Sequence, residues 1–291
     1  MKDLEKLVFN KLKDNPSRIN HVKGVIKVAE ELAKIHDEDV SKAKLAALFH
    51  DYTKYDEISE QTKYLDQEII KKYQDNEFMY HPYSAAIKLK QLLPNVQDDI
   101  LDAIRYHVFG RPNMTKLEKI ILISDKSEPS RTFEDAKIIY KLALNNLDDA
   151  VLYLLESSLK HLKSKGVKPL DEQIQTYNYY KRKEEIMVKY ESVLKVLEDI
   201  KAKDIKVYDF NKTSPFYDYF IIATVNERQA NAAANNLKQS FKDELLNIEG
   251  KSSGWVLVDL NDVIVHLFQA QEREFYGLDK MLYGFQIDNN K

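Results

Sequence analysis

Apolar residues in the first 182 residues recur at spacings of three and four, the period of a helix that buries one face. The clearest runs are Val22, Val25, Ile26, Ala29 and Leu32, and then Leu45, Leu48 and Phe49. Breaks between helical stretches fall at Asn15-Pro16-Ser17, Gly110-Arg111-Pro112 and 166–169, and His81-Pro82 opens a helix, because Pro is tolerated in the first turn. Because no stretch alternates as a strand does, we predict an all-α helical bundle for residues 1–182.

The pattern changes after a charged segment at 183–190, which we interpret as a linker, with a continuous helix as the alternative. The predicted elements beyond it are strands at 205–210 and 219–225, a helix at 226–246 capped by Asn226, and a hairpin at 255–260 and 263–268. Strand and helix alternate, so residues 191–291 are predicted to form a smaller α/β domain with a mixed sheet. The fold class is multidomain.

Composition limits the function classes. A length of 291 residues suggests about two domains, and the absence of cysteine excludes disulfides and thiolate metal sites. No apolar stretch approaches the ~18 residues of a membrane span, and the charged N-terminus lacks a signal peptide's apolar core. We expect a cytoplasmic protein without a membrane partner. The net charge of −3 argues against broad or sequence-specific nucleic-acid binding.

The run LAALFHDYTKY at 45–55 places His50 beside Asp51, and an imidazole next to a carboxylate suits a borderline or hard divalent cation. A lone His-Asp pair is usually a surface ion pair. Here the helical half has four further candidate ligands, each near a predicted helix end or a small or Pro residue: His21, His81, His107 and Asp125. A helical bundle can bring such side chains together in its core. The set could hold one or two ions, with Asp51 as the bridge.

Three cations accompany these candidates: Lys54 follows Asp51 by three residues, Arg111 follows His107, and Arg131 follows Asp125. Guanidinium groups match phosphate oxygens, and a pair of divalent ions assists phosphoryl displacement. The sequence therefore predicts phosphate chemistry. Fe, Mn, Zn and Co all suit these nitrogen and oxygen ligands.

The order His21, His50-Asp51, Asp125 resembles the HD-domain phosphohydrolases. His81-Pro82, AIRYHVFGRP at 103–112 and LEKIILISDKSEPSR at 117–131 are similar to the YqeK-type branch. The resemblance implies symmetrical hydrolysis of diadenosine tetraphosphate to two ADP, with a bound metal usually taken as iron. It also implies the metal ligands His21, His50, Asp51, His81, His107 and Asp125. Asp51, Lys54 and Arg111 would be catalytic, and Lys54, Arg111 and Arg131 would bind substrate. Tyr52-Thr53 departs from the family pattern, which affects substrate choice.

Of the other histidines, we expect His36 and His161 to face solvent and His266 to be a half-buried structural residue. The second half has no acid–His cluster, phosphate loop or nucleophile elbow. SPFYDYFIIATVNERQANAAANNL, GWVLVDLNDVIVHLF and REFYGLDKMLYG resemble the ribosomal silencing factor (RsfS, Iojap-related) family. That resemblance implies a non-catalytic domain that binds a large-subunit ribosomal protein and represses translation by blocking subunit joining.

Together, these inferences predict a fused bifunctional protein, and they leave its oligomeric state open. Two alternatives remain for the first half. It could be a nucleotide sensor without turnover, or a phosphohydrolase of another nucleotide.

Overall fold

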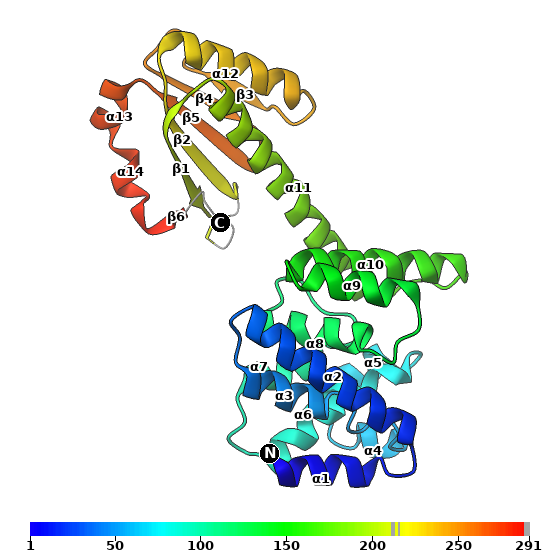
Figure 1. The fold of residues 1–291 in the computed structure, drawn as a ribbon. Coiled ribbons are helices and arrows are strands. Elements are labelled where there is room, and N and C mark those ends of the chain that lie inside the picture. The colour runs from blue at the N-terminus through cyan, green and yellow to red at the C-terminus, as the bar shows by residue number, and fades with distance from the viewer. Residues whose placement is uncertain (211–212, 215, 288–291) are drawn as a thin grey trace. The chain divides into compact units, whose positions relative to one another are not determined.

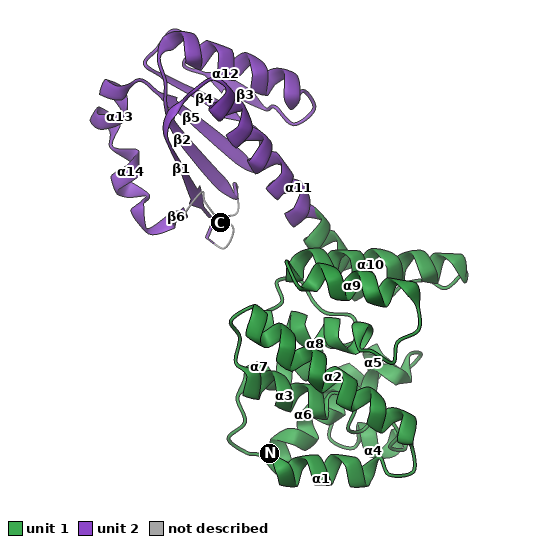
Figure 2. Cartoon of the chain, in the orientation of Figure 1, with its two compact units in different colours: residues 1–181 green, residues 182–291 purple. Residues whose placement is uncertain are grey.

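The computed structural model describes residues 1–210, 213–214 and 216–287 (Figure 1). Residues 288–291, the end of the predicted second domain, lie outside the described residues. The chain divides into two compact units, Met1–Lys181 and Arg182–Lys291 (Figure 2). The predicted fold class is confirmed, because the first unit is helical and the second has a mixed sheet with helices.

The N-terminal unit is built from helices throughout. Its elements are α1 (Lys2–Lys11), α2 (Pro16–Ile35), α3 (Val40–Phe49), α4 (Ile58–Thr62), α5 (Gln67–Lys72), η1 (Glu77–Met79), α6 (Tyr80–Leu92), α7 (Asp98–Arg105), α8 (Lys116–Ser127), α9 (Glu134–Ala143), α10 (Leu147–Ser164) and the start of α11 (Asp171–Asp199). The predicted breaks at 15–17, 110–112 and 166–169 separate helices, and His81-Pro82 lies in the first turn of α6 as expected. Asn15 caps α2, also as expected. Helix α8 lies in the middle of the unit and packs against α2, α3, α7, α9 and α10.

Helix α11 runs through the predicted linker at 183–190 without interruption. Residues 171–199 contain no Gly or Pro that would break it. Tyr180 packs in the core of the first unit, whereas Ile186, Tyr190 and Val193 pack in the core of the second. These apolar positions, spaced by three and four, keep the segment helical, so 183–190 is the continuous helix that we held as the alternative.

The C-terminal unit contains a six-stranded mixed sheet. Its elements after α11 are β1 (Lys203–Asp209), β2 (Tyr219–Thr224), α12 (Glu227–Ser240), β3 (Asn247–Glu249), β4 (Trp255–Asp259), β5 (Val263–Phe268), α13 (Ala270–Tyr276), α14 (Leu278–Met281), η2 (Tyr283–Phe285) and β6 (Gln286–Ile287). The strand order is β3-β4-β5-β2-β1-β6, in which β2 and β5 are parallel and the other pairs are antiparallel. The predicted hairpin of β4 and β5 is confirmed, and Asn261 in its turn has φ 71°.

Successive residues of each strand enter different cores, as the pleat requires. Val207 and Ile221 lie in one core with α11 and α12 residues, whereas Tyr208 and Ile222 lie in a second core with Leu278 of α14. The sheet is thus covered on both faces.

The helix predicted at 226–246 ends early, at Ser240. Phe241 is buried at φ −122° and ends the helix. The Leu246 N–H then donates to the Asp259 carbonyl at 2.9 Å, which starts the pairing of β3 with β4. The last residues of the predicted helix thus form a turn that leads into β3. In the part of the chain that the structure describes, no helix has the length and apolar character needed to cross a membrane.

Candidate metal centre

The start of α2 positions the first candidate ligand. Pro16 occupies the first helical position, where its missing N–H costs nothing, and the Asn15 side chain accepts from the Arg18 N–H at 3.2 Å. His21 then lies in the second turn with 5% of its surface exposed. The cap sets where the helix begins and therefore which face His21 occupies.

The end of α3 positions the central pair. The helix ends at Phe49, and His50 and Asp51 follow in a tight turn, where they are 0% and 1% exposed. Ala46 and Ala47 are fully buried, so the last turn of the helix packs closely inside the bundle. Such burial of a carboxylate is costly unless other groups compensate.

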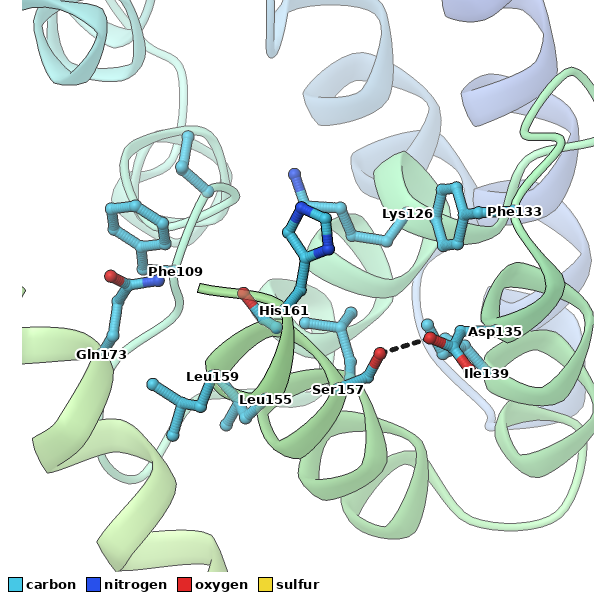
Figure 3. Close-up of a pocket in the computed structure, with 13 residues that line it drawn as sticks. Phe109, Lys126, Phe133, Asp135, Ile139, Leu155, Ser157, Leu159, His161 and Gln173 are labelled. Atoms are coloured by element: carbon cyan, nitrogen blue, oxygen red, sulfur yellow. Dashed lines mark hydrogen bonds between the residues drawn. The ribbon is translucent and has the colours of Figure 1, made fainter. Parts of the chain in front are cut away.

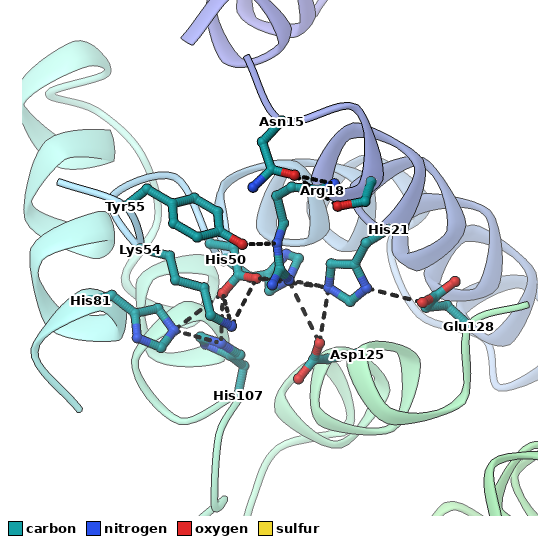
Figure 4. A network of polar contacts seen from close by, with 12 residues as sticks. Asn15, Arg18, His21, His50, Lys54, Tyr55, His81, His107, Asp125 and Glu128 are labelled. Atoms are coloured by element: carbon teal, nitrogen blue, oxygen red, sulfur yellow. Dashed lines mark hydrogen bonds and ion pairs between the residues drawn. The ribbon is translucent and has the colours of Figure 1, made fainter. Parts of the chain in front are cut away.

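The remaining candidates also lie near helix ends. His81 is the second residue of α6, His107 comes two residues after α7, and Asp125 lies in the last turn of α8. All three are buried. The bundle thereby directs side chains from five helices or their ends to one point, as Figure 4 shows.

Every imidazole is fixed through its Nδ1 atom. The Nδ1 atoms of His50, His81 and His107 lie 2.7, 2.5 and 2.7 Å from the carbonyl oxygens of Ala47, Phe78 and Ile104. His21 Nδ1 lies 3.0 Å from Glu128 Oε1. Because these partners only accept, the neutral form of each imidazole carries its proton on Nδ1 and leaves the Nε2 lone pair for a ligand. This orientation is typical of histidines that bind metals.

The four Nε2 atoms converge on Asp51. Its Oδ2 lies 3.3 Å from His50 Nε2 and 3.7 Å from His21 Nε2. Its Oδ1 lies 3.1 Å from His81 Nε2 and 3.6 Å from His107 Nε2. Two groups able to hold a metal follow, one of His21, His50 and Asp51 and one of Asp51, His81 and His107. Asp51 belongs to both.

Asp125 extends the first group, since its Oδ1 lies 3.1 Å from His21 Nε2 and 3.8 Å from His50 Nε2. The two Nε2 atoms are themselves 3.2 Å apart, and those of His81 and His107 are 3.3 Å apart. Lone pairs and carboxylate oxygens at such distances repel one another unless positive charge lies between them. The donor set therefore fits a divalent cation with nitrogen and oxygen ligands.

The pKa shifts agree with this demand for positive charge. Burial alone would raise the pKa of Asp51, but His50, His107 and His81 hold it well below its usual range. Burial opposes protonation of His50, yet Asp51 and Asp125 raise its pKa overall. Burial lowers the pKa of His107 to about 4, which keeps it neutral and able to act as a ligand near pH 7.

Four cations contact the carboxylates of the cluster, and two of them, Arg18 and Lys126, were not predicted from the sequence. Lys54 Nζ lies 3.2 Å from Asp51 Oδ2, and Arg131 Nη2 lies 2.8 Å from Asp125 Oδ1. Arg18 was missed, although its Nη1 lies 2.6 Å from Asp51 Oδ2. Arg18 precedes His21 by three residues on α2, so helical spacing could have identified it.

Arg111 lies in a different environment. Its Nε donates to the buried Glu118 Oε1 at 2.6 Å, and its guanidinium stacks over the Tyr106 ring at 4.7 Å. It borders a small cavity that Lys72 and Glu172 also line. The contacts found for Arg111 among the described residues do not include the metal cluster, so its assignment as catalytic stays a prediction.

Glu128 holds the His21 ring and Gly24 leaves room for Glu128, and neither residue was predicted from the sequence. Glu128 is 1% exposed and also accepts from the Ser130 N–H at 2.7 Å. A Cβ atom at Gly24 would lie 2.5 Å from Glu128 Oε2, so only glycine leaves room for this carboxylate. Glu128 follows Asp125 by three residues, a spacing that could have indicated a shared site.

The other histidines have structural environments. His161 is exposed as predicted, but the prediction for His36 was wrong, because its Nε2 lies 2.5 Å from the Ala143 carbonyl and the residue is half-buried. His266 is structural as expected and more deeply buried than predicted, at 4% exposure.

Comparison with known proteins agrees with this division. Residues 18–130 match the family model "HD domain", and residues 183–290 match "Ribosomal silencing factor during starvation". The chain therefore joins an HD hydrolase domain to a ribosomal silencing factor domain.

Individual relatives define the families further. The symmetrical bis(5'-nucleosyl)-tetraphosphatase of Bacillus subtilis is 37% identical over 165 residues, covering 56% of this chain and 88% of that protein. The ribosomal silencing factor RsfS of Chromobacterium violaceum is 36% identical over 96 residues, covering 31% of this chain and 79% of that protein. The chain thus belongs to the symmetrical tetraphosphatase family in its N-terminal part and to the RsfS family in its C-terminal part.

A solved structure supports the first assignment. An HD superfamily hydrolase from Clostridium acetobutylicum, described as involved in NAD metabolism, superposes with a TM-score of 0.57 at 30% identity. The match covers 62% of this chain and 97% of that one. The fold of the N-terminal unit is therefore that of an HD hydrolase.

Proposed function

We propose that residues 1–182 form a metal-dependent hydrolase that cleaves diadenosine tetraphosphate symmetrically to two ADP. In this reaction a water oxygen joins one of the two central phosphorus atoms, and the P–O bond that links it to the other breaks. The convergence of four Nε2 atoms on Asp51 carries the proposal. Similarity to the Bacillus subtilis enzyme favours this substrate.

His21, His50, Asp51 and Asp125 would hold one ion, and Asp51, His81 and His107 a second. Iron is the expected metal, and Mn, Zn and Co suit the same ligands. When bound, such ions supply Lewis-acid activation of water and of the phosphoryl group. The residues of the chain fix the ligand atoms in place through the Nδ1 contacts, and they exclude bulk water because each ligand is at most 5% exposed.

Three cations would orient the polyphosphate. Lys54 and Arg131 contact the carboxylates of Asp51 and Asp125, and their side chains are 33% and 29% exposed. Arg18 contacts Asp51 and is 16% exposed. With positive ions bound between the ligands, these carboxylates need less neutralisation from the side chains. The three cations then become available to phosphate oxygens and stabilise the charge that develops during cleavage.

The first test incubates the purified chain, with its metal content measured, with diadenosine tetraphosphate and separates the products by chromatography. ADP as the sole product is the expected result. AMP plus ATP would contradict symmetrical cleavage. No turnover after iron or manganese is restored would favour the nucleotide sensor or another nucleotide as substrate, and a substrate panel then distinguishes these two.

We propose that residues 191–291, after the segment 183–190, bind the large ribosomal subunit through one of its proteins and repress translation by blocking subunit joining. The match of residues 183–290 to the silencing factor family supports this proposal. It implies a cytoplasmic protein. Co-sedimentation of the chain with purified large subunits, and light scattering during subunit joining, test it. Unchanged joining in the presence of excess chain would contradict the proposal.

A further inference from the structure

A pocket of about 430 Å³ opens in the N-terminal unit between the loop after α7, the start of α9 and the end of α10 (Figure 3). Leu155 and Leu159 form part of its apolar wall, and Phe109 and Phe133 contribute aromatic rings. Its volume lies in the ~300–1,000 Å³ range of small-molecule sites. None of the six proposed metal ligands lines it, so the pocket is distinct from the cation cluster.

The pocket nevertheless adjoins that cluster. Val108 lines it and directly follows His107, and Lys126 lines it and directly follows Asp125. Lys126 Nζ lies 2.6 Å from Asp125 Oδ2, so one side chain contacts both the pocket and a proposed metal ligand. Lys126 therefore links the edge of this pocket to the cluster.

The lining combines apolar and aromatic surface with a few polar groups. Phe133 lines the pocket and is 45% exposed, so its ring is accessible to a ligand. The Gln173 carbonyl accepts from the Leu170 N–H at 3.0 Å, and Figure 3 shows the amide nitrogen pointing to the pocket interior. Asp135 accepts from the Tyr153 hydroxyl at 2.9 Å and from Ser157, and its carboxylate retains further acceptor capacity.

These features match a purine base. The flat ring system stacks on aromatic faces, its ring nitrogens accept from an amide N–H, and an exocyclic amine donates to a carboxylate. We propose that this pocket binds one purine nucleoside end of the polyphosphate substrate, with Phe133 as a stacking residue and Gln173 as a hydrogen-bond donor. The proposal rests on the proposed function, because it assumes that the phosphates lie at the cation cluster.

The experiment measures binding, so that it does not depend on turnover. The full chain, loaded with Mn²⁺, is titrated calorimetrically with ADP and separately with inorganic pyrophosphate, which has no base. Ser158→Tyr fills the pocket from α10, and Ser164→Tyr places the same ring at the exposed, non-lining end of that helix as a control. We expect Ser158→Tyr to weaken ADP binding at least tenfold and to leave pyrophosphate binding unchanged, with Ser164→Tyr like the unmodified chain.

Phe133→Ala gives a second variant that does not add volume, with the exposed, non-lining Ile138→Ala as its control. We expect ADP to bind about tenfold more weakly to Phe133→Ala. Unchanged ADP binding in both pocket variants would overturn the nucleoside site, even if the chain hydrolyses the tetraphosphate. If the unmodified chain shows no turnover, but both pocket variants bind ADP more weakly and pyrophosphate equally well, the proposed hydrolysis is overturned and the nucleoside site is retained.

Discussion

Both units of the chain bury histidine, with opposite results. In the N-terminal unit, four imidazoles direct Nε2 toward the carboxylate of Asp51, which lies 3.1 Å from the nearest of them. In the C-terminal unit, His266 lies among the rings of Phe220, Trp255 and Phe268. Its Nδ1 accepts from Trp255 Nε1 at 3.2 Å, and its buried Nε2 has no hydrogen-bond partner among the described residues.

The difference shows that burial alone does not make a histidine a ligand. His107 and His266 both have a pKa lowered to about 4 by burial. Only His107 has its Nδ1 held by a carbonyl, which leaves Nε2 as an acceptor facing a carboxylate. The tautomer and the neighbours, and not the pKa, distinguish the candidate metal centre from a structural histidine.

The largest expected effect follows from removing the charge that both metal groups share. Asp51→Asn keeps the shape of the side chain but removes the negative charge from both groups. We expect hydrolysis to fall roughly a thousandfold, with loss of bound metal. Product chromatography and elemental analysis of the purified variant measure the two quantities.

Asp56→Asn is the matched control, because Asp56 lies five residues away and pairs with Lys11 at the surface. It should change hydrolysis and metal content little. Near-normal metal content and turnover in Asp51→Asn would contradict the site assignment.

A smaller effect on metal binding is expected from replacing Glu128, which holds the His21 ring. Glu128→Ala removes the acceptor that holds Nδ1, and metal affinity should fall 10–100-fold, as for other residues that orient metal-bound histidines. Gly24→Ala should act in the same direction, because the new methyl group displaces Glu128. Metal titration with a competing chelator measures both variants. The exposed Glu134→Ala is the control, and equal affinity in all three would refute the role of Glu128.

The pH dependence of the stability of the C-terminal unit tests the interpretation of His266 as a structural histidine. His266 has a pKa of about 4 in the folded state against 6.5 when exposed. Between these two pKa values the unfolded chain binds more protons than the folded chain. The contribution of neutral His266 to the unfolding free energy is therefore complete above pH 6.5 and is lost as the pH falls toward 4. We expect a loss of about 2 kcal/mol between pH 7 and pH 5.

Trp255 provides the measurement, because it is the only tryptophan of the chain and contacts His266. Its fluorescence during urea unfolding at pH 7 and pH 5 reports the stability of this unit. His266 is also the only histidine after residue 182. In His266→Gln the difference between the two pH values should largely disappear, and an undiminished difference would assign it to other groups.

The smallest effects concern two helix caps. Asn15→Ala and Asn226→Ala each remove a side chain that accepts a backbone N–H, and each should cost about 1 kcal/mol of unfolding free energy. Circular dichroism during thermal unfolding measures both. Only Asn15→Ala should also reduce hydrolysis, because its helix positions His21. Equal hydrolysis in the two variants would show that the Asn15 cap does not help to position His21.

The sequence by itself determined the helical and α/β regions and the six candidate ligands. Spacings of three and four, Pro and Gly breaks, and strand-type runs are local signals, and the quoted motifs lie within short segments. Lys54 and Arg131 were found for the same reason, because each follows a ligand closely in the chain.

Only the tertiary structure decided which atoms meet. Glu128 and His21 are 107 residues apart in sequence, and the space that Gly24 leaves for Glu128 exists only once α2 and α8 pack together. The early end of α12 at Ser240 was also not visible in the sequence pattern, because Phe241 is buried in the core of the second unit and a turn leads from it to β3. Local structure specifies the elements and also the Nδ1 partners of His50, His81 and His107, which lie three residues earlier in the chain. Long-range packing brings the ligands together, places Glu128 beside His21 and forms the pocket beside the centre.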